Sequence, residues 1–144
     1  MTEGVRKKIM EKYESGDKRF SYENFDGADL SNLPIAGSNF SHTSLRNSDL
    51  SRSVLGLGDF YDTDFTGADL SWCNLTQAKM GNANLSNANL TSATLFKANL
   101  KDAILTGANL NMAYLGSAIM PDGKQYTKGM DITQYGAKGI PMDM

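Results

Sequence analysis

Large apolar residues recur at every fifth position through most of the chain, without any change of register. An amphipathic helix would place them three or four residues apart, and a half-buried strand would alternate them with polar residues. A period of five fits neither pattern, so it restricts the fold more than any other feature. The repeated positions are Phe20, Phe25, Leu30, Ile35, Phe40, Leu45, Leu50, Leu55, Phe60, Phe65, Leu70, Leu75, Met80, Leu85, Leu90, Leu95, Leu100, Leu105, Leu110, Leu115 and Met120.

A small residue stands two places before nearly every one of these large residues. It is alanine at each repeat from Ala78 to Ala118, and only Lys18, Glu23 and Leu33 break the rule. A large and a small inward residue two apart describe one short extended side, and the residues that follow turn a corner. Four such sides close a square, so one coil takes about 20 residues and pairs with its neighbours at roughly 4.8 Å, as strands do. The sequence therefore predicts an all-β solenoid.

A square coil requires residues 20 apart to stack directly on one another. The apolar positions then fall into four columns, and each side of the coil is named here after the first residue of its column. The Phe20 column holds Phe20, Phe40, Phe60, Met80, Leu100 and Met120, and the Phe25 column holds Phe25, Leu45, Phe65, Leu85 and Leu105. The Leu30 column holds Leu30, Leu50, Leu70, Leu90 and Leu110, and the Ile35 column holds Ile35, Leu55, Leu75, Leu95 and Leu115. We expect about five coils and a rod roughly 25 Å long.

The repeats "ADLSW", "ANLSN", "ANLTS" and "ANLNM" share the motif Ala-(Asp/Asn)-Leu-X-X. Over residues 18–122 the chain resembles the pentapeptide-repeat family, whose members form right-handed quadrilateral β-helices. Its flanking segments are similar to those of short cyanobacterial members. The resemblance implies no enzymatic activity for most such proteins, and it implies that some members imitate B-form DNA and bind DNA gyrase.

Residues 1–17 are predicted to form a capping helix, because a solenoid must cover the core residues at its ends. Val5, Ile9 and Tyr13 recur at a spacing of four, so residues 3–14 form a short amphipathic helix. Its basic residues also suggest a helix on a membrane surface, but about three turns with acidic neighbours argue against that use. We expect a cap and no membrane contact.

The repeats of residues 18–122 end at Met120, where "PDG" at 121–123 is a turn signal. The tail, residues 123–144, has enough apolar residues to fold over the last coil. Self-association through that end is the competing interpretation, so we expect a monomer or an end-to-end dimer. The apolar residues of the tail are Tyr126, Met130, Ile132, Tyr135 and Ile140.

Composition narrows the classes of function. The 144 residues carry a net charge of −2, which gives no field that would attract nucleic acid. The single cysteine excludes an intramolecular disulfide framework and suits a reducing compartment. The first residues lack an apolar leader, and no long apolar run occurs. We therefore expect a soluble, cytoplasmic protein.

Residues that could carry chemistry are few. His42 is the only histidine and belongs to an outward corner, which excludes a site built from several histidines. Cys73 occupies a small inward position, where a thiol acts as a small apolar group. The glycines of "GLGDF" at 56–60 are not followed by a helix, so they do not form a phosphate loop. We predict no catalytic residue, no cofactor and no metal.

Asp29, Asp49 and Asp69 precede stacked leucines, so three carboxylates are expected to line up on one side of the rod. Such a ladder would suit a cation or the imitation of DNA. The favoured interpretation is that these side chains bind local backbone in the turns. Asn89 and Asn109 continue the same column without charge, which supports that interpretation.

Outward apolar residues gather on the Ile35 side. Val54, Leu57, Phe96 and Tyr114 belong to that side, and Trp72 lies at the corner before it. A cluster on one side of a rigid rod is typical of a contact surface. We predict a non-enzymatic interaction or regulatory scaffold with a protein partner. The alternative is a DNA-mimicking inhibitor of a DNA-binding enzyme such as a type II topoisomerase.

Overall fold

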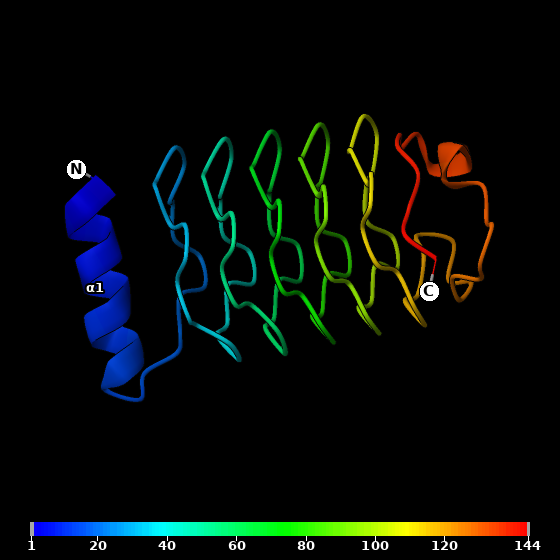
Figure 1. Cartoon of the computed structure of the whole chain (residues 1–144). Coiled ribbons are helices and arrows are strands. Elements are labelled where there is room, and N and C mark those ends of the chain that lie inside the picture. The colour runs from blue at the N-terminus through cyan, green and yellow to red at the C-terminus, as the bar shows by residue number, and fades with distance from the viewer. Residues whose placement is uncertain (1, 144) are drawn as a thin grey trace.

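The computed structural model describes residues 2–143 as a rod of stacked coils with a helix across its N-terminal end (Figure 1). The α-helix α1 spans Thr2–Glu14, and the short 3-10 helix η1 spans Ile132–Tyr135 near the other end. Within residues 2–143 the coils contain no extended strand, because each side contributes a single β-bridge before the chain turns. Among the same residues no helix has the length and apolar character needed to cross a bilayer.

Parallel bridges join residues 20 apart along the whole rod, from Arg19 with Asn39 to Asn99 with Ile119. The predicted 20-residue coil is therefore confirmed. Backbone hydrogen bonds run from each coil to the next, as where the Leu90 amide donates to the Asn109 carbonyl at 2.8 Å. This pairing satisfies the backbone groups of the extended sides without a sheet in the usual sense.

Each corner is a β-turn that begins at the large apolar residue. The amide of the small residue donates to the carbonyl three positions earlier, as from Ala88 to Leu85 at 3.0 Å. The second residue inside each turn has φ between 56° and 74°, the conformation that type II turns require and that glycine adopts most easily. Sixteen of these turn residues are not glycine, so pairing between coils imposes the conformation on ordinary side chains.

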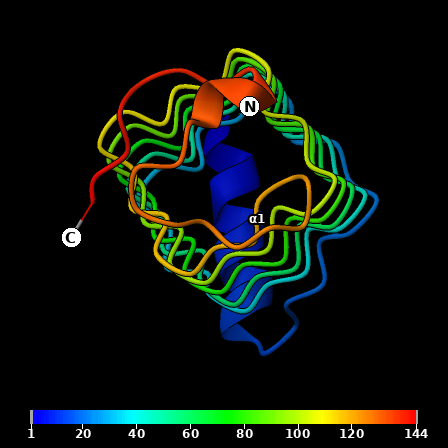
Figure 2. The same ribbon diagram turned by 90° about the vertical axis from the view of Figure 1, so that its right-hand side faces the viewer.

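The four columns point inward and form the core of the rod. Figure 2 shows the backbone of the stacked coils end-on. Leu90 is buried in the middle of its column with Leu70 and Leu110, and nearly every other column residue is buried as well. Phe25 differs from the expectation, since it is only partly buried. It belongs to the first coil, where a hollow between helix α1 and the coil leaves the Phe25 ring incompletely covered.

Helix α1 lies against the first coil, as the amphipathic pattern predicts. Ile9 is buried, and the Tyr13 hydroxyl donates to the Ala36 carbonyl at 2.7 Å. Arg6 donates to the Ser31 carbonyl at 2.8 Å and forms an ion pair of 3.5 Å with Asp29. The basic side of the helix is thus partly used in contacts with the rod.

The tail folds back onto the last coil and continues its pairing on three sides. Tyr126 and Ile132 are buried there, as expected. The sequence predicts that Ile140 joins them, but its side chain is 76% exposed. Pro141 lies in the outermost extended segment and has no amide hydrogen for a further strand. The bridges of the tail are Ile119 with Gln125, antiparallel, and Asn109 with Lys138 and Tyr114 with Met142, both parallel.

Candidate partner-binding side

The Ile35 side presents the apolar residues that the sequence places on it. Leu57 is 63% exposed, Trp72 58% and Val54 43%, and Phe96 and Tyr114 are half-buried. Val54 and Tyr114 occupy the bridge position of their coils, so they point outward between the corners. Their assignment to partner binding remains a prediction.

Trp72 stands at the corner before the Ile35 side in a conformation that favours glycine. Its φ is 60°, and its amide donates to the Thr91 carbonyl of the next coil at 3.0 Å. The Arg52 guanidinium lies 5.5 Å from the centre of the Trp72 ring, within cation–π range. Pairing between coils and this cation therefore hold an exposed indole in place.

Phe96 and Tyr114 form a second aromatic group on the same side. Their rings are stacked, with centroids 5.9 Å apart and 8° between the planes. The Lys97 ammonium lies 5.2 Å from the centre of the Phe96 ring. Each of the two aromatic groups thus carries a cation of its own.

Two further residues extend this side and were missed from the sequence. Met112 is 46% exposed at the same corner as Trp72, two coils further along, and its 40-residue spacing could have revealed it. Its amide donates to the Ile140 carbonyl at 2.8 Å, which brings the exposed Ile140 beside it. Ile140 lies outside the repeats, so no periodic signal marks its place.

The acidic ladder of the Leu30 side is stacked, since Asp49 bridges both Asp29 and Asp69. Each of these carboxylates accepts from the amide and the hydroxyl of the serine two residues later, at 2.6–3.1 Å. The bonds from Ser31 lower the pKa of Asp29. These local hydrogen bonds match the favoured interpretation of the ladder.

A model of pentapeptide repeats matches the chain in eight copies, over residues 24–67, 55–82, 68–107 and 83–120. The chain belongs to the pentapeptide repeat family. Proteins of this family are generally structural or interaction scaffolds and not enzymes. Comparison with curated protein sequences gives no match.

Solved structures of other pentapeptide repeat proteins are similar to this one. HetL from the cyanobacterium Nostoc sp., involved in the regulation of heterocyst differentiation, is 28% identical with a TM-score of 0.59. The alignment covers 75% of this chain but only 60% of HetL. A thylakoid lumen protein of Arabidopsis thaliana is 26% identical over 82% of this chain and 87% of its own, with a TM-score of 0.58. A protein from the cyanobacterium Cyanothece, 23% identical over 93% and 99%, has a TM-score of 0.53 and supports the fold alone.

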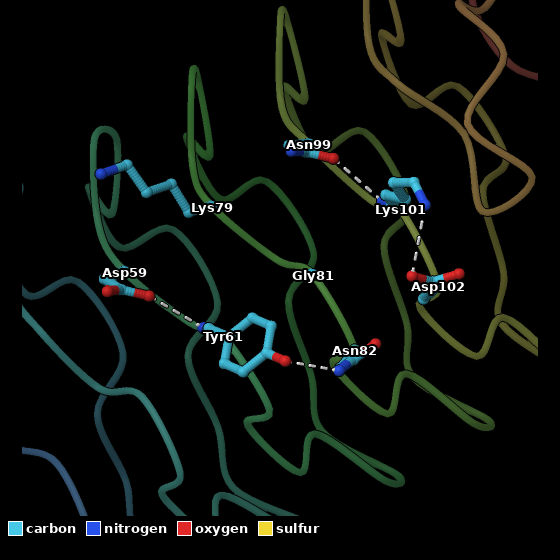
Figure 3. Close-up of a pocket in the computed structure, with 8 residues that line it drawn as sticks. All are labelled: Asp59, Tyr61, Lys79, Gly81, Asn82, Asn99, Lys101 and Asp102. Atoms are coloured by element: carbon cyan, nitrogen blue, oxygen red, sulfur yellow. Dashed lines mark hydrogen bonds and ion pairs between the residues drawn. The ribbon is translucent and has the colours of Figure 1, made fainter.

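This pentapeptide repeat protein also has a hollow of about 420 Å³ on its Phe20 side (Figure 3). It opens where Gly81 replaces the larger Tyr61 and Lys101 of the adjoining coils. The Asn82 amide donates to the Tyr61 hydroxyl at 2.7 Å and fixes the ring at one edge. Two lysines and two aspartates balance in charge along its wall. The lining residues are Asp59, Tyr61, Lys79, Gly81, Asn82, Asn99, Lys101 and Asp102.

His42 and Cys73 are both held by structural contacts. The His42 ring stacks on Tyr22 with centroids 4.8 Å apart, and its Nδ1 lies 2.9 Å from an Asp62 carboxylate oxygen. The Cys73 thiol is buried and donates to the Leu50 carbonyl at 2.8 Å. Burial raises the pKa of this thiol to about 12, which removes its nucleophilic form at neutral pH. Within residues 2–143 no group of three acidic, histidine or cysteine side chains could hold a metal.

Proposed function

We propose that this protein is a non-enzymatic scaffold that binds a protein partner through the Ile35 side of a right-handed quadrilateral β-helix. The observation that carries the proposal is the exposure of Trp72, Leu57 and Val54 on one side of a rigid rod. Large aromatic and aliphatic side chains on a fixed backbone are the usual anchors of protein interfaces. The proposal includes a cytoplasmic location, which the single cysteine supports.

The backbone beneath these residues supports the proposal. Leu57, Trp72 and Met112 all have φ near 60°, where a bulky side chain is costly and glycine is not. Glycine occupies the equivalent turn position at Gly27, Gly37, Gly67 and Gly107. A chain selected only for stability would place small residues at these corners, so large apolar ones there favour a role outside the fold.

The DNA-mimicking alternative has weaker support. The carboxylates of Asp29, Asp49 and Asp69 are engaged with neighbouring serines, and Asn89 and Asn109 follow them in the stack. A mimic of DNA needs a continuous negative stripe, whereas the ladder here stops after three coils. The net charge of −2 is also too small for a protein that imitates DNA.

The test is affinity capture of the native partner from its own cells by tagged variants. Trp72→Ser combined with Phe96→Ser should abolish capture, since truncation of an aromatic anchor costs about 2 kcal/mol or more of binding. Tyr22→Ser is the matched control, because Tyr22 is an exposed aromatic with φ of 61° at a different corner. Thermal melting should show that all variants are folded at the capture temperature.

The triple change of Asp29, Asp49 and Asp69 to Asn separates the two functions. Under the scaffold proposal the triple variant captures the same partner as the parent protein. If capture survives the aromatic double change and fails with the triple change, the Ile35 side is the wrong surface and the DNA-mimicking function takes its place.

We further propose that the protein is a monomer. Helix α1 covers the N-terminal end of the rod. At the C-terminal end, Pro141 lacks an amide hydrogen and so interrupts the row of backbone hydrogen-bond donors in the outermost segment. Sedimentation equilibrium should give the mass of one chain, and a dimer would favour the competing end-to-end arrangement.

A further inference from the structure

The Ile35 side and its two corners are free of acidic residues. They comprise residues 31–37, 51–57, 71–77, 91–97 and 111–117, which contain no Asp or Glu and two cations, Arg52 and Lys97. The other three sides and their corners carry all nine carboxylates of residues 18–120. These nine are Glu23, Asp26, Asp29, Asp49, Asp59, Asp62, Asp64, Asp69 and Asp102.

The difference is clear at one structural position, the bridge residue before each large apolar one. On the other three sides this position holds aspartate five times, as Asp29, Asp49, Asp59, Asp64 and Asp69. On the Ile35 side it is occupied by Pro34, Val54, Asn74, Thr94 and Tyr114. Because the backbone is the same on all four sides, the fold does not require this change.

The two cations stand over the apolar residues. Arg52 lies over Trp72 at one corner, and Lys97 lies over Phe96 at the other. Neither has an ion-pair partner among the side chains of the described part of the chain, whereas Arg46 pairs with Asp64 and Lys101 with Asp102 elsewhere on the rod. Both cations are therefore available to a carboxylate from outside.

The C-terminal end of the same side has a similar character. Lys128 lines a small hollow together with Tyr114 and Met142. Asp143, in the same hollow, accepts from the Tyr126 hydroxyl at 2.8 Å. The Asp143 carboxylate is thus engaged within the protein.

We propose that the Ile35 side binds an acidic polypeptide segment in which Asp or Glu residues flank apolar ones. The inference rests on the proposed function, since it names the chemistry of the partner for that side. The apolar side chains of the segment pack on Trp72, Phe96 and Tyr114, and its carboxylates pair with Arg52 and Lys97. A side without carboxylates accepts an acidic segment with no like-charge repulsion.

A single-stranded nucleic acid would also contact aromatic rings and cations on the Ile35 side, but the positive charge of this side is too small to bind a phosphate backbone. Nucleic-acid affinity grows with the number of phosphates that are neutralised, and two exposed cations on a chain of net charge −2 neutralise few. Apolar side chains such as Val54, Leu57 and Met112 also have nothing to pack on along a phosphate backbone. The surface is better matched to a polypeptide.

Fluorescence anisotropy with short labelled probes and the full chain tests the proposal. The acidic probe is a peptide of Glu and Asp flanking Leu and Phe. A second peptide replaces each acid by Lys, a third replaces each Leu and Phe by Ala, and the fourth probe is single-stranded oligothymidylate. The acidic apolar peptide should bind at least about tenfold more tightly than the other three probes. Added salt should lower the affinity of the acidic apolar peptide.

A pair of double variants locates the binding. Arg52→Gln with Lys97→Gln should weaken binding of the acidic apolar peptide about tenfold, because both charge contacts to its carboxylates are lost. Arg46→Gln with Lys101→Gln is the matched control, since these residues flank the Phe25 side opposite. The control should bind the peptide like the parent protein.

Three results would overturn the inference. These are equal affinity for the acidic and the basic peptide, equal loss of affinity in the two double variants, and tighter binding of oligothymidylate than of the acidic peptide. These failures are distinct from failure of the proposed function. If the Trp72 and Phe96 change abolishes native capture while the acidic peptide has no preference, the Ile35 side is an interface for a partner of other chemistry.

Discussion

The hydroxyl oxygen of Tyr114 occupies space that a side chain on Gly116 would need, since a Cβ atom there would lie 2.4 Å away. The backbone of Gly116 has a negative φ, so only this close approach requires glycine. The glycine thereby allows the Tyr114 ring to lie flat along the corner and stack on Phe96. The stacked pair of Tyr114 and Phe96 on the Ile35 side thus depends on glycine at position 116.

Gly116→Ala should displace the Tyr114 ring and weaken its stacking on Phe96. We expect the free energy of unfolding to fall by about 0.5–1.5 kcal/mol, the usual contribution of an aromatic pair. Denaturant titration of a double-mutant cycle with Tyr114→Ala tests the cause, because the glycine change should cost little once the ring is gone. Additive costs would show that the two residues are independent.

Leu90→Ala should lower the free energy of unfolding by about 2–5 kcal/mol through lost burial and a cavity. Leu90 is 1% exposed, and its neighbours Leu70 and Leu110 are fully buried, so the rod has no loose side chain to fill the space. Urea titration checks this, with exposed Lys79→Ala as the control. A midpoint shared with the control would contradict the stacked column.

Ala88→Leu should destabilise the protein by about 1–3 kcal/mol, because overpacking displaces the coils on either side. Ala88 is fully buried between Leu85 and Leu90. Lys79→Leu adds a leucine at an exposed bridge position and should change stability by about 0.5 kcal/mol or less. Matching losses in the two variants would refute the inward assignment of the small residues.

Cys73 should resist alkylation in the folded protein. Burial raises the pKa of its thiol to about 12 from an ordinary 9.0, so iodoacetamide at about pH 8 should modify the chain only after unfolding. The unfolded chain loses this proton at a lower pH than the folded one, so the free energy of unfolding should fall as pH rises from 9.0 towards about 12. Cys73→Ala should reduce that slope. Rapid modification of the folded protein would show that the thiol is accessible.

The sequence predicts the coil and its core because every column residue repeats the same physical demand. Leu90 is assigned to the core by its period alone, and the small residue Ala88 by its distance from it. The first coil departs from the pattern, since a hollow beside helix α1 leaves Phe25 only partly buried. Ile140 could not be placed, because the tail pairs with the last coil through backbone that carries no repeat.

The candidate site could be predicted only in part, for a similar reason. Trp72 is recognisable as outward from its register, but the cation over it depends on the rotamer of Arg52, which the sequence does not determine. The hollow beside Gly81 arises from one missing side chain between two coils. Such a gap becomes visible only when neighbours 20 residues apart are placed side by side.

The constant 20-residue coil limits how this protein can change in length. A duplication of one five-residue repeat would keep large residues in the core but turn every later residue by a quarter of the circumference. Trp72 and Tyr114 would then face different directions if the duplication fell between them. Only the gain or loss of a whole coil, 20 residues at once, lengthens or shortens the rod while leaving its four outer surfaces continuous.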